Sequence, residues 1–204
     1  MRSKFCVERF RIPTSRLFIF LLILFISFSA SGWEDQNRFV EIGLFMTGVF
    51  LLAIASLGRL WCSLYIAGRK TVSLVTEGPY SLCRNPLYFF SFLGCIGVGL
   101  ATETFLIVFI MVLAFLVYYP FVIKKEEFRL EEIHGEVFSA YKKRTSAFFP
   151  RFADLKEPQE YLVNPVLFRD HIFSALWFVW VLGILEMVES LHEAGFLPVL
   201  FKIY

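Results

Sequence analysis

Residues 74–88 read Leu-Val-Thr-Glu-Gly-Pro-Tyr-Ser-Leu-Cys-Arg-Asn-Pro-Leu-Tyr, a polar, turn-rich stretch between two apolar runs of membrane-spanning length. A second polar stretch, residues 126–141, begins with two glutamates and follows the next pair of apolar runs. Two spans that form an antiparallel hairpin return the chain to the membrane face from which it started. The sequence therefore predicts that both polar stretches contribute to one site at the boundary between lipid and water.

The composition is that of a membrane protein. Of the 204 residues, 57% are hydrophobic and 19% aromatic, and the mean hydropathy is +0.65, more than a soluble domain of this length can hide in one core. We therefore predict an all-α, polytopic integral membrane protein that forms a single membrane domain over residues 1–204. Its expected partners are lipids or lipidated molecules from the bilayer, and not nucleic acids.

A spanning helix needs about 20 apolar residues, and the apolar runs predict about five spans. These are residues 17–32, 39–66, 86–101, 104–123 and 171–191. Residues 124–144 predict a cytoplasmic amphipathic helix with Phe128, Ile133, Val137 and Tyr141 on its apolar side. The two prolines within 154–165 indicate a linker to the last span, which is an addition to the predicted catalytic region at about 65–150.

The basic residues predict the orientation. Lysines and arginines number five in residues 1–16, three in 68–85 and nine in 124–169, whereas the opposite connections hold only Arg38 and Lys202. The positive-inside rule then places the amino terminus and both polar stretches in the cytoplasm. Arg59 lies one to two turns before the cytoplasmic end of its span, where either snorkelling or a functional contact would explain it.

Two further features leave alternatives open. Residues 1–32 have a basic leader, an apolar run and small residues near position 30, so they fit a cleaved signal peptide as well as a first span. Cys83, within the first polar stretch, fits either a small buried hydrophobe or a reactive thiol. The cysteines and histidines are dispersed, and we assign none of them to a metal site.

The first polar stretch combines turn residues with side chains that have no evident structural duty. Gly-Pro at 78–79 predicts a turn, and Asn-Pro at 85–86 predicts a capped helix start. Arg84, Tyr80 and Tyr88 are left crowded near the positive end of that helix. This arrangement suits a ligand that carries a carboxylate and polar rings.

The second polar stretch opens with Glu126 and Glu127 at the end of a span. Carboxylates are costly there unless water or a cationic ligand accompanies them. A solvated helix segment would also explain them, so both interpretations stay open at this point.

Together the two stretches resemble the isoprenylcysteine carboxyl methyltransferases and their phospholipid methyltransferase relatives. The pattern is TxGPYxxxRNPxY over residues 76–88, EExxLxxxHGxxFxxY over 126–141, and then Pro150. The resemblance covers about residues 65–150. It implies a cytoplasm-facing pocket for S-adenosylmethionine, closed by the helix hairpin and reached by a lipid substrate sideways from the bilayer.

The resemblance also implies which positions contact the cofactor. They are Val72, Ser73, Leu74, Val75, Tyr80, Asn85, Pro86, Leu87, Tyr88 and Glu126, with Tyr65 at the border. Arg84 and Glu127 are added as candidate catalytic residues because of their charge and proximity. The function expected is methyl transfer to a lipid or to a prenylated, isoprenylcysteine-like substrate.

Two departures from the family pattern bear on the substrate. Asn85 stands where the family usually has histidine, and an amide cannot titrate near neutral pH. Val122 stands where an arginine holds the prenylcysteine carboxylate in the eukaryotic enzymes, and Lys124 and Lys125 are the candidate substitutes.

Two other functions are compatible with the sequence. A membrane sterol or steroid reductase that binds NADPH has a similar Arg-x-Pro region, although the glutamate pair of the second stretch argues against it. A noncatalytic scaffold or lipid-binding subunit that retains the fold is the other alternative, which Asn85 and Val122 keep open.

Overall fold

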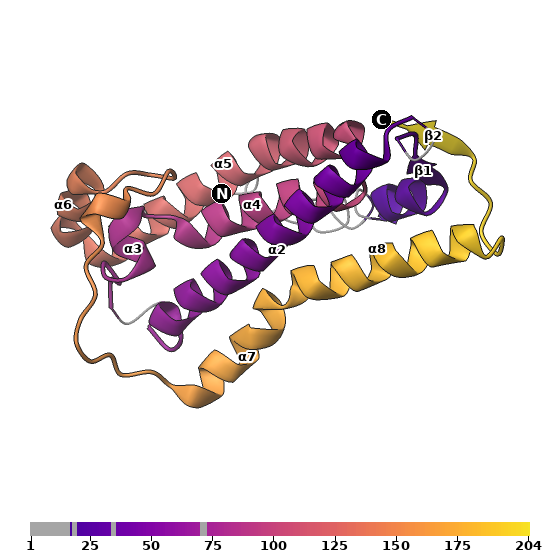
Figure 1. Ribbon diagram of the computed structural model, residues 1–204. Helices are drawn as coiled ribbons and strands as arrows, with labels where there is room; N and C mark the ends of the chain where they lie inside the picture. The colour runs from indigo at the N-terminus through magenta and orange to yellow at the C-terminus, as the bar shows by residue number, and fades with distance from the viewer. Residues whose placement is uncertain (1–16, 18–19, 34–35, 70–72) are drawn as a thin grey trace.

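The computed structural model describes residues 17, 20–33, 36–69 and 73–204, and it is mostly helical (Figure 1). Residues 20–27 are helical. The named elements that follow are β1 (Ser29–Ser31), α2 (Arg38–Ile66), α3 (Pro79–Leu82), α4 (Pro86–Ala101), α5 (Phe105–His134), α6 (Glu136–Arg144), the 3-10 turn η1 (Phe152–Asp154), α7 (Pro165–Ala175), α8 (Trp177–Glu193) and β2 (Phe201–Ile203).

Within the described ranges, three helical segments are long and apolar enough to cross a membrane. They are α2, α5 and the continuous run Pro165–Glu193 formed by α7 and α8, while α4 is apolar but shorter. Helix α2 and the run Pro165–Glu193 contain the predicted spans 39–66 and 171–191, and α5 contains the predicted span 104–123 apart from its first residue. Within the predicted span 17–32, residues 18 and 19 are outside the described residues, and residues 29–31 form β1 and not helix.

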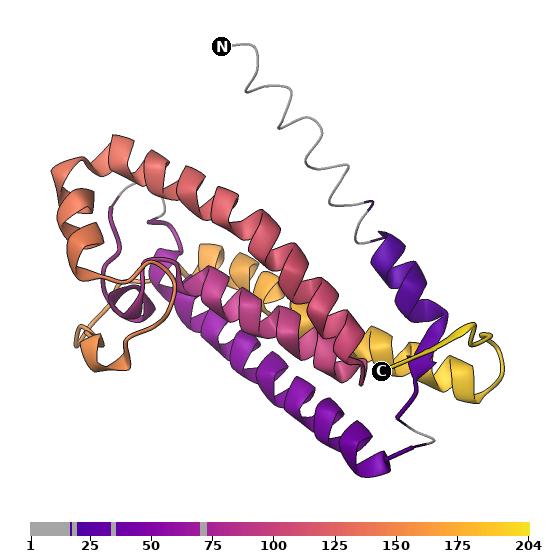
Figure 2. The same cartoon turned by 90° about the horizontal axis from the view of Figure 1, so that it is seen from above.

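Helices α2, α4 and α5 form the centre of the bundle, and α8 runs along it (Figures 1 and 2). The core consists of Leu52, Ala55, Val98, Ala101 and Phe178. Glycines let α2 and α4 approach closely, because a Cβ at Gly48 would lie 2.6 Å from the backbone nitrogen of Ala101. This close approach fixes the register between α2 and α4, and α4 carries the first polar stretch at its start.

The helix boundary expected near residue 123 is absent. Helix α5 continues through the charged residues to His134 and ends at Gly135, whose φ of +53° and ψ of −123° suit only glycine. The predicted amphipathic helix at 124–144 is thus divided between the end of α5 and a separate α6. Of the side chains expected on its apolar side, Tyr141 is buried, as is Phe138, whereas Phe128, Ile133 and Val137 are exposed.

The bundle has two distinct ends. Helices α3 and α6 lie at one end, which we call the α3–α6 end, with the last turn of α2; β1 and β2 lie at the other, the β1–β2 end (Figure 1). At the β1–β2 end the strands pair in parallel, with Ser29 opposite Phe201, and the Leu106 amide donates to the Tyr204 carbonyl at 3.1 Å. Both polar stretches lie at the α3–α6 end, so the prediction that they share one end is confirmed.

Candidate functional site

The first polar stretch is held in place by a tight turn. Gly78 has a φ of +58°, and a Cβ at this position would collide with the Tyr65 ring. Its carbonyl accepts a 2.7 Å hydrogen bond from the Ser81 hydroxyl, and its amide donates to the Lys156 carbonyl at 2.7 Å. The turn is therefore anchored to the segment that follows α6, and α4 begins in a fixed position.

An ion pair joins the two polar stretches. Arg84 Nε lies 2.8 Å from Glu127 Oε1, and the two side chains are only 10% and 14% exposed. Asn85 Nδ2 donates to the same carboxylate oxygen at 3.1 Å. The candidate catalytic residues Arg84 and Glu127 are thus brought together, and each is the other's charge partner.

Backbone carbonyls from the end of α6 and the segment after it complete this network. Arg84 Nη1 donates to the carbonyls of Thr145 at 2.6 Å and Lys142 at 3.0 Å. Asn85 Nδ2 also donates to the Ala147 carbonyl at 2.9 Å. The side chain of Asn85 therefore does not cap α4. Sequence reasoning missed these carbonyl partners, because any residue can supply a main-chain acceptor and no side-chain pattern marks it.

Glu126, the neighbour of Glu127, faces a different partner. The Tyr88 hydroxyl donates to Glu126 Oε2 at 2.7 Å, and the Tyr88 ring lies 5.3 Å from the ring of Tyr119. Tyr119 in turn stacks on Phe115 at 3.9 Å between ring centroids. The Tyr88–Glu126 pair thus joins the start of α4 to α5 at the edge of an aromatic cluster.

The buried phenols and the thiol nearby stay protonated. Tyr141 donates from its hydroxyl to the Tyr80 carbonyl at 2.6 Å, and burial raises the pKa of both tyrosines. Burial also raises the pKa of Cys83 to about 12, so its thiol carries no charge at neutral pH. Of the two interpretations of Cys83, the small buried hydrophobe is the one that fits this environment.

The remaining cofactor positions implied by the resemblance lie apart from these contacts. Val72 is outside the described residues, Ser73 is exposed, and Leu74 and Val75 are half-buried. No side chain among residues 73–75 forms a hydrogen bond with the described part of the site. Pro86 is buried in the first turn of α4, and the Leu87 carbonyl accepts from Ser91 Oγ at 2.8 Å.

The candidate substitutes for the missing arginine are not buried. Lys124 and Lys125 are both exposed, while Val122 is half-buried on α5. One arginine inside the apolar part of the bundle, Arg59, contacts α4 and α7 instead.

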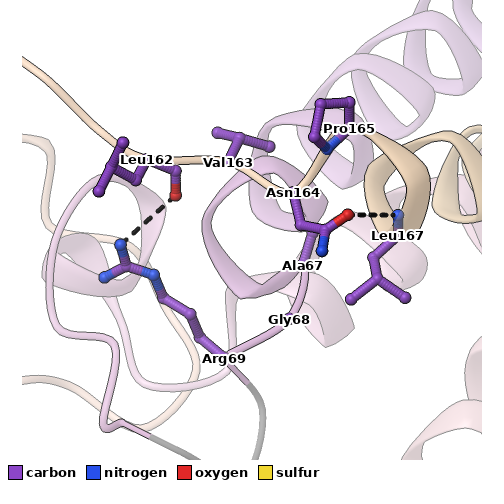
Figure 3. Close-up of a pocket in the computed structure, with 8 residues that line it drawn as sticks. All are labelled: Ala67, Gly68, Arg69, Leu162, Val163, Asn164, Pro165 and Leu167. Carbon is purple, nitrogen blue, oxygen red and sulfur yellow. Dashed lines mark hydrogen bonds between the residues drawn. The ribbon is translucent and has the colours of Figure 1, made fainter.

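An open pocket lies at the end of α2, on the side of the linker to α7 (Figure 3). Asn164 caps α7 there by accepting from the amides of Val166 and Leu167. Arg69 donates to the Leu162 carbonyl at 3.4 Å and lies over the Tyr161 ring, 4.3 Å from its centroid. The pocket has no carboxylate among its lining residues and is not formed by the Tyr88–Glu126 pair.

Three carboxylates gather at the β1–β2 end, away from the polar stretches. Oxygens of Glu41, Glu103 and Glu189 lie within 4.8 Å of one another, close enough to hold a metal ion. Glu41 Oε2 is buried without a hydrogen-bond partner, whereas Glu103 and Glu189 have other interactions. This group is the metal-compatible cluster found in the described part of the chain.

Comparisons with known proteins place the chain among its relatives. It is 37% identical over 94% of its length to the nickel-cobalt-cadmium resistance protein NccN of Alcaligenes xylosoxydans xylosoxydans, covering 89% of that protein. It is likewise 37% identical over 94% of its length to the cobalt-zinc-cadmium resistance protein CzcN of Cupriavidus metallidurans, covering 87% of it. No solved structure matches the chain significantly. Residues 38–137, which contain the Arg84–Glu127 and Tyr88–Glu126 contacts, match the phospholipid methyltransferase family. The chain therefore belongs to the phospholipid methyltransferase family.

Proposed function

We propose that the protein is an S-adenosylmethionine-dependent methyltransferase that acts on a lipid or lipidated substrate at the cytoplasmic membrane face. The observation that carries the proposal is the 2.7 Å bond from Tyr88 to Glu126, because it unites the two family motifs at one end of the bundle. In this proposal the chain has about five spans, and the amino terminus and the α3–α6 end face the cytoplasm. The distribution of lysines and arginines supports that orientation.

The donor groups at this end fit S-adenosylmethionine chemically. The cofactor carries positive charges, hydroxyl groups and a carboxylate. Glu126 offers a carboxylate to its cationic and hydroxyl groups. In the first turn of α4, Pro86 has no N–H and the Tyr88 amide donates to the Asn85 carbonyl at 3.1 Å. The Leu87 amide is left for a carboxylate, because the Asn85 side chain does not cap the helix. In the proposed site Glu126, Tyr88 and the start of α4 bind the cofactor.

The contacts of Arg84 and Glu127 suggest a positioning role for both. Glu127 Oε1 accepts hydrogen bonds from both the Arg84 guanidinium and the Asn85 amide, so protein donors already occupy this oxygen. Held by Glu126, Tyr88 and the start of α4, S-adenosylmethionine would supply an electrophilic methyl group for a lone pair of the acceptor. The protein's own task is to align the acceptor and exclude water.

This arrangement favours an acceptor that needs no deprotonation. An amine acceptor would first have to lose a proton, and both glutamates of the site are engaged by donors. A carboxylate or another anionic group can accept the methyl directly. The Tyr80 and Tyr141 phenols, whose pKa values are raised by burial, are also unsuited to act as bases.

The cofactor assignment is tested by Glu126→Gln. We expect the affinity of the purified protein for S-adenosylmethionine to fall at least about tenfold, because the charged acceptor is lost. Isothermal titration calorimetry measures the affinity. Expression and thermal stability should change little, because the amide oxygen still accepts from Tyr88.

Glu132→Gln is the matched control, since Glu132 lies on the same helix and is exposed. Equal affinities of the two variants for S-adenosylmethionine would contradict the assignment. Binding of NADPH in place of S-adenosylmethionine would favour the reductase alternative, and binding of neither would favour a noncatalytic scaffold.

The relatives suggest a physiological setting. Both are named as resistance proteins for cobalt and cadmium, and one each also for nickel and zinc. We propose that this chain contributes to metal resistance through its membrane methyltransferase activity.

The test is the growth, on these metals, of a strain that depends on the chain for resistance. The strain carries wild type, Glu126→Gln or Glu41→Gln. Loss of resistance in Glu126→Gln is expected; loss only in Glu41→Gln would instead indicate direct metal binding at the β1–β2 end.

A further inference from the structure

Arg59 is a charged residue within the apolar part of α2. It lies about two turns before the helix ends at Ile66, or roughly 10 Å along the axis at ~1.5 Å per residue. Its Nη1 donates to Ser91 Oγ on α4 at 2.5 Å. Its Nη2 donates to Ser174 on α7, to Oγ at 3.0 Å and to the carbonyl at 3.2 Å. The guanidinium of Arg59 on α2 therefore bridges α4 and α7.

The charge of Arg59 is not neutralised by these contacts. Every hydrogen-bond partner is a neutral oxygen, and no carboxylate in the described residues forms an ion pair with it. Its Nε is buried and has no acceptor. The Phe178 ring, 5.8 Å from Cζ, adds only a weak cation–π contact. Both serines are neutral, so these contacts do not account for the positive charge of Arg59.

Arg59 also lies close to the proposed cofactor site along α4. Its partner Ser91 is one turn after Tyr88 on the same helix, which is about 5 Å along the axis. Tyr88 holds Glu126 at 2.7 Å. A molecule bound at Arg59 would therefore lie about one helical turn deeper in the bundle than the Tyr88–Glu126 pair. A small polar headgroup can span that separation.

We propose that Arg59, with Ser91 and Ser174, binds the oxyanion of the membrane-embedded methyl acceptor. This inference rests on the proposed function and names its substrate class: an amphiphile with a phosphate or carboxylate in its headgroup. The fork of the guanidinium matches both anions and is well suited to bind them where water is scarce. Arg59 would thereby supply, from α2, the positive charge that Val122 cannot supply from α5.

The inference is tested by lipid binding to the purified full-length chain in a neutral detergent. The probes are dioleoyl phosphatidic acid, oleate, the uncharged dioleoylglycerol and inorganic phosphate, and the readout is the dissociation constant from calorimetric titration. We expect wild type to bind at least one of the two anionic lipids, and neither dioleoylglycerol nor inorganic phosphate to bind comparably. Arg59→Gln should weaken that binding about tenfold to hundredfold.

Arg38→Gln is the matched control, because Arg38 lies on the same helix at the β1–β2 end. Unchanged lipid binding in Arg59→Gln would overturn the inference. If inorganic phosphate binds as tightly as the anionic lipids, the inference that the bound anion belongs to a lipid is overturned. Equal binding of dioleoylglycerol would show that the charge is irrelevant and would overturn it too.

A second measurement uses only wild type and so avoids any folding defect in the variant. Modification of arginines by phenylglyoxal, mapped by mass spectrometry, should be suppressed at Arg59 by the anionic lipid that binds and not by dioleoylglycerol. Equal modification of Arg59 with and without that lipid would contradict the inference.

S-adenosylmethionine binding is measured in the same preparations. If wild type binds the anionic lipid but not S-adenosylmethionine, the proposed function is refuted and the anion site stands. Arg59→Gln is expected to keep its affinity for S-adenosylmethionine.

Discussion

Arg84 and Glu127 illustrate how the contacts of a residue separate positioning from chemistry. Both are candidate catalytic residues by charge and place in the sequence, yet they pair with each other. Arg84 also donates to backbone carbonyls, and Glu127 also accepts from Asn85. A charged pair that is only 10% and 14% exposed is costly to break, because removing one partner leaves the other uncompensated. The pair therefore links the residues just before α4 to α5, next to the Tyr88–Glu126 contact.

Arg84→Gln should lower the thermal stability of the detergent-solubilised protein. The expected loss of free energy of unfolding is about 3 kcal/mol, because Glu127 then stays largely buried without its cation. Differential scanning fluorimetry against Arg129→Gln, an exposed arginine on α5, measures the effect. Full stability combined with lost methyl transfer would instead assign Arg84 a direct part in catalysis.

Cys83 should resist alkylation in the folded protein. Burial raises the pKa of its thiol to about 12, so at pH 8.5 the reactive thiolate is well under about 0.1% of the population. Iodoacetamide labelling at pH 8.5, followed by mass spectrometry, checks this, with the denatured protein as the positive control. Rapid labelling of Cys83 in the folded state would mean that the first polar stretch opens to solvent.

At the level of elements, the break between α5 and α6 determines what the second polar stretch can reach. Helix α5 carries Glu126 and Glu127, and α6 carries Tyr141, which bonds back to Tyr80. Only the turn at Gly135, with its φ of +53°, lets α6 fold back in this way. The geometry of one glycine therefore determines whether Tyr141 can close over the first polar stretch.

Gly135→Ala is expected to destabilise the protein by about 1–3 kcal/mol. A Cβ at Gly135 would meet nothing within 4 Å, so the cost is purely one of backbone conformation. Gly183→Ala is the matched control: this glycine also has open space, lies within α8 and should gain slightly in helix propensity. Thermal unfolding of the two variants should move in opposite directions, and a stable Gly135→Ala would contradict the turn.

The elements also show what sequence patterns can and cannot locate. Tyr88 and Glu126 could be predicted to lie at one end because a two-span hairpin fixes which helix ends are neighbours, and this is confirmed. The end of α5 could not be predicted, because charged residues such as those at 124–132 indicate where the chain leaves the lipid and not where the helix ends. Lysine, arginine and glutamate are good helix formers, so the helix continued. The contact of Arg59 with Ser174 depends on how α7 packs, which no periodicity reveals.

At the scale of the whole molecule, the membrane family and three apolar segments indicate a membrane protein, and the proposed orientation can be tested directly. Green fluorescent protein fused after residue 160 should fluoresce in a bacterial host, since that position follows the α3–α6 end and is predicted to be cytoplasmic. A fusion after residue 204 should be dark, because the protein does not mature when exported through the general secretory route in unfolded form. Fluorescence of both fusions would contradict a single span between residues 160 and 204.

The parallel pairing of β1 with β2 has a consequence for biogenesis. Strand β1 precedes helix α2 in the chain, whereas β2 (Phe201–Ile203) follows α8. The edge of β1 therefore stays without its partner strand until α8 and β2 have been synthesised. Proteolytic trimming after residue 32 would remove Ser29–Ser31 and leave β2 permanently unmatched. A chain that signal peptidase has cut after residue 32 therefore cannot form the β1–β2 pair.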